Sequence, residues 1–105
     1  MSDYIDKRRN GALIRSKLIH WSQFVQLTGI NPYMLSELLE MGWVESVQTS
    51  SENYHFPVKE IFRVQKLVRI CRDFELSTIG GMIIVDLLER IENQDKEIQQ
   101  LRRLI

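Results

Sequence analysis

The chain has 105 residues, of which 14 are acidic and 14 basic, and its length suits one globular domain. An apolar content of 44% with only five Gly and two Pro favours a folded, helix-rich protein over a disordered or fibrous one. The single cysteine, Cys71, excludes an internal disulfide and fits a reducing compartment.

The N-terminal segment is polar and charged. We expect residues 1–12 to form a flexible tail, whose basic residues include Lys7, Arg8 and Arg9. The tail lacks the apolar run of a secretion signal, and no later run approaches the roughly 20 apolar residues of a membrane span. We therefore expect a cytoplasmic protein. After the tail, Leu18-Ile19 is compatible with a short strand.

Two short helices are predicted next. Apolar residues on one side and a terminating Gly29 predict a helix over about 21–28. Asn31-Pro32 is a strong helix start, and leucines at three- and four-residue steps predict a second helix over about 32–41. The tight turn between them predicts a helix-turn-helix unit.

A small β-hairpin, or wing, is predicted after the second helix. Residues 43–47 and 54–56 have strand-like composition, and they flank a polar, turn-rich run. Pro57 then precedes a third helix, predicted over about 58–74. Its expected buried side consists of Ile61, Val64, Leu67, Val68, Cys71 and Phe74.

Ser77-Thr78 predicts the start of a last helix that runs to the chain end. Its apolar residues recur in sevens, which predicts either a homodimeric coiled coil or a stripe folded back on its own domain. In the coiled coil, Gln94 would set the register. The expected domains are the tail (1–12), a winged helix-turn-helix domain (13–76) and a dimerisation helix (77–105). The expected dimerisation residues are Ile84, Leu87, Ile91, Gln94, Ile98, Leu101 and Ile105.

The sequence offers little for catalysis or metal binding. His20 and His55 are the two residues that could act as near-neutral bases, and Cys71 lies among apolar neighbours, where a thiol is usually inert. One Cys and two separated His do not make a zinc site. We expect no enzymatic activity, no metal and no cofactor.

The order of these elements carries a family resemblance. The run from Trp21 to Glu45, the wing ending in Tyr54-His55-Phe56, the third helix and the closing helix together resemble MerR-type winged helix-turn-helix proteins, and most of all the CbpM-type chaperone modulators. The fold class expected is mainly α, with a hairpin wing and a C-terminal coiled-coil helix. The residues that carry the resemblance are Phe24, Thr28-Gly29-Ile30, Leu38-Leu39, Gly42, Val44-Glu45, Phe56, residues 67–72, Phe74-Glu75-Leu76 and residues 83–88.

The resemblance implies two alternative functions. CbpM-type proteins bind the J-domain of a DnaJ-like (CbpA-like) co-chaperone and restrain its cooperation with Hsp70, whereas MerR-type regulators bind DNA. Charge separates the two, because residues 18–57 contain four Glu and no Lys or Arg, and phosphate binding needs cations. The basic residues of the third helix and the tail remain as support for DNA binding.

A basic partner suits the acidic segment, and the resemblance implies that the second helix of a J-domain is basic. We expect carboxylates to steer the partner while Met and Trp supply apolar contact. A site on the last two helices, or one shared between protomers, stays open, as does an assembly adaptor with an unrelated protein partner. The expected partner-binding residues are Met34, Glu37, Glu40, Met41, Trp43 and Glu45.

Overall fold

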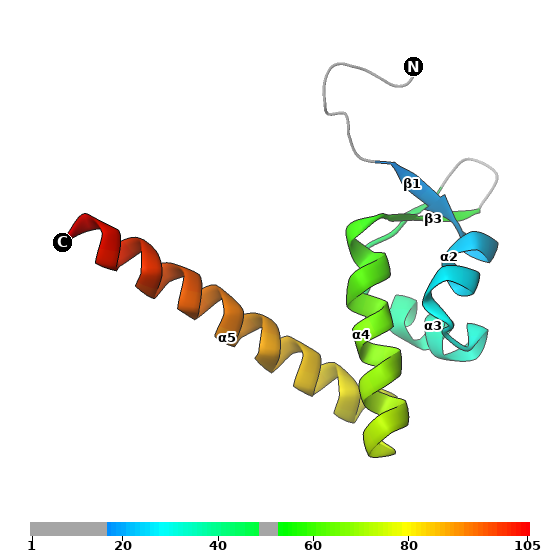
Figure 1. Cartoon of the computed structure of the whole chain (residues 1–105). Helices are drawn as coiled ribbons and strands as arrows, with labels where there is room; N and C mark the ends of the chain where they lie inside the picture. Colours follow the sequence, from blue (N-terminus) through cyan, green and yellow to red (C-terminus); the bar gives the residue numbers. More distant parts are fainter. Residues whose placement is uncertain (1–16, 49–52) are drawn as a thin grey trace. The chain divides into compact units, whose positions relative to one another are not determined.

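Helices make up most of the computed structural model, which describes residues 17–48 and 53–105 (Figure 1). Each helix predicted from the sequence is present, with its ends shifted by a residue at most. The mainly α winged helix-turn-helix with a small hairpin wing is therefore confirmed. In chain order the elements are β1 (Leu18–His20), α2 (Trp21–Thr28), α3 (Pro32–Glu40), β2 (Val47–Gln48), β3 (Tyr54–Pro57), α4 (Lys59–Phe74) and α5 (Thr78–Leu104).

Two compact units divide the chain, one reaching to Gln65 and the other running from Lys66 to Ile105. Their boundary falls inside α4, so this helix contributes to both. The domains 13–76 and 77–105 stay a prediction, and the predicted tail of residues 1–12 lies outside the described residues. None of the described helices combines the length and apolar character needed to cross a membrane.

Glycine and asparagine fix the turn between α2 and α3. Gly29 adopts a left-handed conformation with φ of 73°, and its N–H donates to the carbonyl of Val25 at 2.9 Å, which closes α2. The Asn31 side chain then accepts a hydrogen bond from the Tyr33 N–H at 2.8 Å, and Pro32 takes the first helical position. These contacts set where α3 begins.

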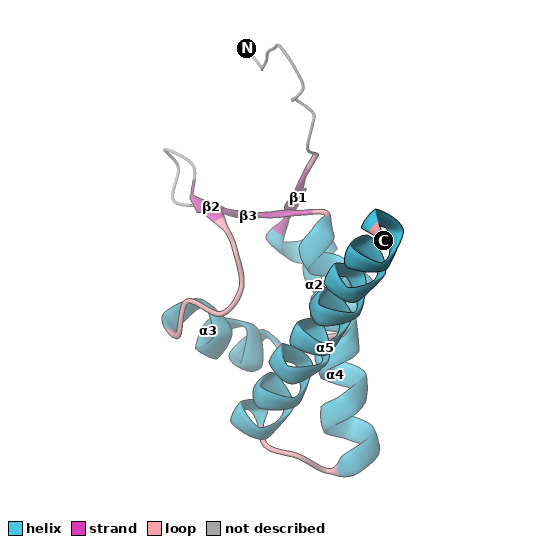
Figure 2. Cartoon of the chain, turned by 90° about the vertical axis from the view of Figure 1, so that its left-hand side faces the viewer, coloured by secondary structure: helices cyan, strands magenta, loops and turns pink. Residues whose placement is uncertain are grey.

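The three short strands form one antiparallel sheet in the order β1-β3-β2 (Figure 2). Ile19 of β1 pairs with Phe56, and Val47 of β2 pairs with His55. The strand predicted over residues 43–47 begins only at Val47, and that part of the prediction was wrong. The backbone before β2 forms its hydrogen bonds outside the sheet. The Trp43 N–H donates to the carbonyl of Leu38, and the Glu45 N–H donates to the Glu60 carboxylate.

The core of the first unit lies between the helix-turn-helix, β3 and the start of α4. The rings of Phe24 and Phe56 stack there with centroids 4.1 Å apart, which joins α2 to β3. Val64 places the first half of α4 in the same core. The fully or nearly fully buried apolar side chains of this unit are Phe24, Ile30, Leu35, Leu38, Val44, Phe56 and Val64.

In the second unit, α5 lies close to α4 at a glycine. A Cβ built on Gly81 would lie 2.3 Å from the Sγ atom of Cys71 and 2.9 Å from Leu67, so only glycine allows this approach. Val85, one turn further along α5, is fully buried. Phe74 was expected on the buried side but is 70% exposed, because it lies in the last turn of α4 and the chain reverses directly after it at Glu75 (φ 52°).

Candidate functional site

Helix α3 presents one polar face that is not used for packing. Its buried residues Leu35 and Leu38 turn one side toward the core. Tyr33, Glu37 and Glu40 recur at steps of four and three residues, so they share the opposite, exposed side. We call this surface the α3 face.

The structure separates the six predicted partner-binding residues into two groups. Glu37, Glu40 and Met41 are exposed on or beside the α3 face, and Met34 is half-buried at its edge. Trp43 and Glu45 lie beyond the end of α3, in the connection to β2, where both contact α4. The structure therefore brings four of the six residues together.

Tyr33 belongs to the α3 face, and the sequence analysis missed it. Its side chain is 85% exposed, the largest fraction for any aromatic residue among the exposed large hydrophobics. The helical spacing of Tyr33 to Glu37 was the available signal. An exposed tyrosine beside two carboxylates is a typical amphipathic contact residue of protein interfaces.

A shallow groove of about 290 Å³ runs beside the α3 face. Glu40 contributes a carboxylate to it, while Trp21 and Tyr54 contribute aromatic rings whose centroids lie 6.2 Å apart. Such a lining can take a basic side chain, since a carboxylate and an aromatic face both attract a cation. The groove is lined by Trp21, Ser36, Leu39, Glu40, Ser46 and Tyr54.

Arg63 of α4 holds Trp43 in place through a hydrogen bond and a cation–π contact. The Arg63 Nη1 atom donates to the Trp43 carbonyl at 2.6 Å, and the guanidinium carbon lies 3.8 Å from the centroid of the indole ring. Arg63 also pairs with the Glu60 carboxylate at 3.5 Å. Glu60 is only 3% exposed. Its buried carboxylate is compensated by the Arg63 guanidinium and by the hydrogen bond that it accepts from the Glu45 N–H. We call Trp43, Glu60 and Arg63 the anchor cluster.

Glu45 is paired rather than free. Its carboxylate lies 2.9 Å from the Nζ atom of Lys59, and both side chains are exposed. The hydrogen bond and the negative charge of Glu45 raise the pKa of Lys59 above its ordinary value of 10.5. Glu45 is therefore partly neutralised, and the contribution of such an exposed pair to stability is small.

Cations are scarce in the described part of the first unit, residues 17–48 and 53–65. This part contains Lys17, Lys59 and Arg63, and the last two contact carboxylates. The described residues of α3 and the wing contain no cation at all. The predicted basic tail residues Lys7, Arg8 and Arg9 lie outside the described residues.

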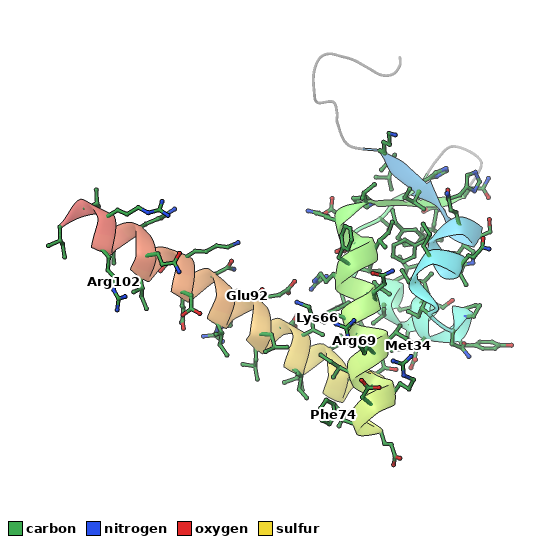
Figure 3. All side chains as sticks on the ribbon, viewed as in Figure 1. Met34, Lys66, Arg69, Phe74, Glu92 and Arg102 are labelled. Atoms are coloured by element: carbon green, nitrogen blue, oxygen red, sulfur yellow. The ribbon has the colours of Figure 1, made fainter. Side chains whose placement is uncertain are left out.

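The predicted dimerisation residues follow one exposed side of α5. Ile91, for example, is 54% exposed, and Ile84 at the start of the stripe is half-buried. Gly81 and Val85, which face α4, lie on a different side of α5. Glu92 also lies on the α4-facing side of α5. The Lys66 side chain of α4 points toward it, with 3.8 Å between their charged atoms (Figure 3). The exposed residues of the stripe are Leu87, Ile91, Gln94, Ile98, Leu101 and Ile105.

The structure places the residues that the sequence offered as candidates for catalysis as follows. His20 and His55 are neighbours on paired strands, with ring centroids 4.7 Å apart. Burial raises the pKa of the Cys71 thiol, which disfavours the reactive thiolate. Among the described residues, no group of three or more His, Cys, Asp or Glu is placed to hold a metal ion.

Comparison with known families identifies the fold. Residues 19–103 match the model of the MerR HTH family regulatory proteins, and this stretch covers every described helix and strand except the start of β1 and the end of α5. The chain belongs to the MerR helix-turn-helix family. Within this MerR-family chain, α3 is the second helix of the helix-turn-helix, and β2 and β3 are the strands of the wing. A search of curated proteins gives no match.

Proposed function

We propose that this MerR-family chain is a non-catalytic binding protein that docks on the J-domain of a DnaJ-like co-chaperone and inhibits its cooperation with Hsp70. The observation that carries the proposal is the α3 face, on which Tyr33, Glu37 and Glu40 stand where a DNA-binding member needs cations. A protein of this kind, with a free Cys71 thiol, suits the reducing cytoplasm.

The contacts proposed at this surface follow from its chemistry. Glu37 and Glu40 steer a basic helix of the J-domain and set its orientation, since charges at an interface mainly control association rate and specificity. Tyr33 and Met41 supply apolar contact around the carboxylates. The groove beside Glu40 receives one basic side chain of the partner. Trp43 and Glu45, held by α4, support the docking surface from behind its edge.

Inhibition needs no chemistry in this proposal. Hsp70 must contact the J-domain for the co-chaperone to stimulate ATP hydrolysis, and a bound inhibitor that covers the same basic surface prevents that contact. Competition of this kind predicts that this chain lowers J-domain-stimulated ATP hydrolysis, and that excess Hsp70 restores it.

The test compares two charge reversals of equal size. E37K/E40K changes the α3 face, whereas D73K/E75K makes the same change in net charge at the exposed end of α4. We expect E37K/E40K to weaken binding to a purified J-domain in calorimetry by at least tenfold, and D73K/E75K to leave it unchanged. Equal affinity of E37K/E40K and the original chain contradicts docking on the α3 face, and selective weakening by D73K/E75K moves the site to the last two helices.

DNA-binding regulation is the second candidate, because the matched family is described as regulatory and α4 carries exposed Arg69 and Arg72. A gel shift with genomic fragments separates the candidates. Tight, salt-sensitive and sequence-selective binding to duplex DNA would contradict the co-chaperone proposal, because specific DNA binding loses affinity steeply with salt.

We also propose that the chain is a homodimer through the exposed stripe of α5. A lone helix gains nothing from holding isoleucines and leucines in water at heptad positions, whereas a partner helix buries them. Sedimentation equilibrium over a range of concentrations is expected to give twice the chain mass of 12.5 kDa. A mass that stays at one chain at the highest concentration contradicts the homodimer.

A further inference from the structure

The groove beside the α3 face repeats part of the chemistry of the anchor cluster. In that cluster, the guanidinium carbon of Arg63 lies 3.8 Å from the centroid of the Trp43 ring, and Nη1 lies 3.5 Å from the Glu60 carboxylate. In the groove, Trp21 and Glu40 supply the same two kinds of partner, an indole and a carboxylate. None of the six described residues that line the groove is Lys, Arg or His. The groove therefore offers partners for a cation that its own lining does not provide.

We propose that this groove is a binding site for the side chain of one arginine, which is supplied by the protein that docks on the α3 face. The identity of that protein, a J-domain, rests on the proposed function, to which the type of residue that the groove takes is added. Trp21, Glu40 and Tyr54 are the residues that select arginine over lysine.

The folded wing holds the two rings of the groove together. His20 of β1 pairs with His55 of β3 in an antiparallel register, so Trp21 and Tyr54 are the next pair of neighbours. Their ring centroids lie 6.2 Å apart, and both side chains are half-buried. The Trp21 ring also lies 6.0 Å from that of Phe56, which is fully buried. The aromatic wall is thus part of the folded unit and needs no partner to form.

Hydrogen-bond acceptors lie beside the two rings. Ser36 and Glu40 are one helical turn apart on α3, and Ser46 follows in the connection to β2. Glu40 is exposed, and no other described residue forms a hydrogen bond or an ion pair with its carboxylate. A guanidinium carries several N–H donors in one plane, so it can bond to carboxylate and hydroxyl oxygens while the plane lies against an aromatic ring.

The size of the groove fits a single side chain. Its volume of about 290 Å³ lies just below the range of roughly 300–1,000 Å³ that is typical of pockets for small-molecule ligands. The groove is also shallow and adjoins the α3 face through Glu40. A side chain that projects from a docked helix can therefore enter it while the helix contacts the rest of the face.

The physical chemistry of the two cations favours arginine. The lysine ammonium is compact and strongly hydrated, and it has no flat face to stack on a ring. The guanidinium is more weakly hydrated and stacks on aromatic rings, which lowers the cost of leaving water for a shallow groove. Trp43 in the same chain already contacts a guanidinium in this way.

Titration with capped amino acids tests the site directly. N-acetyl-arginine amide and N-acetyl-lysine amide are added separately to the full-length chain, and NMR follows the indole N–H signals of its two tryptophans. We expect the Trp21 signal to shift, with capped arginine binding about fivefold more tightly than capped lysine. Trp43, which Arg63 already covers, is the internal control. A Trp21 signal that does not respond, or that responds equally to both probes, overturns the proposal.

A pair of matched variants links this response to the groove. E40Q removes one charge from an exposed side chain of the lining, and we expect it to weaken the binding of capped arginine about fivefold. E75Q removes the same charge at the exposed turn after α4 and is expected to bind as the original chain does. Unchanged binding of capped arginine in E40Q contradicts the assigned site.

Competition with a purified J-domain separates this proposal from the proposed function. Capped arginine is expected to weaken J-domain binding in calorimetry more than capped lysine does at the same concentration and ionic strength. W21L, whose native fold is checked by circular dichroism, is expected to weaken J-domain binding as well, and E40Q repeats this test without changing a half-buried side chain.

Two further outcomes are distinguishable. If the J-domain binds but capped arginine, W21L and E40Q all leave its affinity unchanged, the groove receives no arginine of the partner and the proposal fails. If the J-domain does not bind the original chain at all, the proposed function fails, and the titration with capped arginine still shows whether the groove is an arginine site.

Discussion

The guanidinium of Arg63 lies over the indole of Trp43, with its carbon atom 3.8 Å from the ring centroid, while it donates to the carbonyl of the same residue. The arginine also neutralises Glu60, the one charged residue that the described core buries. The Arg63 side chain therefore makes a cation–π contact, a hydrogen bond and an ion pair at the same time. The connection between α3 and the wing is therefore held by α4 and not by strand pairing.

R63M is expected to destabilise the fold by about 3 kcal/mol, because Glu60 would stay buried without its cation. The free energy of unfolding from urea titration measures the effect. K59M is the matched control, since it removes the exposed pair with Glu45, and we expect its midpoint to coincide with that of the original chain. An equal decrease in the free energy of unfolding in R63M and K59M would show that the anchor cluster stabilises the fold no more than the exposed pair does.

G81A is expected to destabilise the second unit by about 1–3 kcal/mol, because the added methyl group meets the Sγ atom of Cys71 and the side chain of Leu67. G80A is the matched control, as a methyl group there has only Ser77 Oγ within 3.3 Å. Thermal unfolding followed by circular dichroism compares the two. C71A should recover part of the loss in the G81A background, and no recovery would argue against a clash with the thiol as its cause.

Alkylation of Cys71 is expected to require higher pH than alkylation of an unstructured thiol. Burial raises the thiol pKa above its ordinary 9.0, although a backbone hydrogen bond from Gly81 acts in the opposite direction. Iodoacetamide rates measured from about pH 7 to 10.5 in native buffer and in urea give the two midpoints. Since the folded state holds this proton more tightly, stability should fall as pH rises above the ordinary value. A native midpoint at or below the urea midpoint contradicts the raised pKa.

N31A is expected to cost about 1 kcal/mol by removing the side-chain cap of α3. N31D keeps an oxygen at the same place and should retain most of the stability. The same two variants test whether α3 must be firmly placed for docking, because a frayed first turn moves Tyr33. Loss of J-domain affinity in N31A with full affinity in N31D is the expected pattern, and equal affinity of both would separate docking from the cap.

Four helix boundaries were predictable from the sequence because each of them is marked by a residue with a specific backbone role. Gly29 and Gly42 adopt positive φ, Asn31 caps α3, and the Ser77 hydroxyl accepts a hydrogen bond from the Gly80 N–H at 3.1 Å. These interactions are local, so a short stretch of sequence contains both partners. The confirmed fold class depends on these same signals.

The errors and omissions arise where the deciding partner is distant in sequence. Val44 is β-branched, as strand residues often are. The residues on either side of it nevertheless form hydrogen bonds outside the sheet: Trp43 with the end of α3, and Glu45 with Glu60, fifteen residues further along the chain. Glu60 itself looks like an ordinary surface residue in the first turn of a helix. Trp21 and Tyr54 meet at the groove only because β1 pairs with β3, which no local pattern reveals.

The middle position of β3 has a consequence for shortened versions of the chain. Residues 18–20 precede the helix-turn-helix, yet they pair with His55, Phe56 and Pro57 along one edge of β3. A version that starts at Trp21 would bare that edge, and unprotected strand edges recruit other strands. Aggregation of such a fragment would then reflect strand pairing at the exposed edge of β3, and should not be mistaken for assembly through the C-terminal helix.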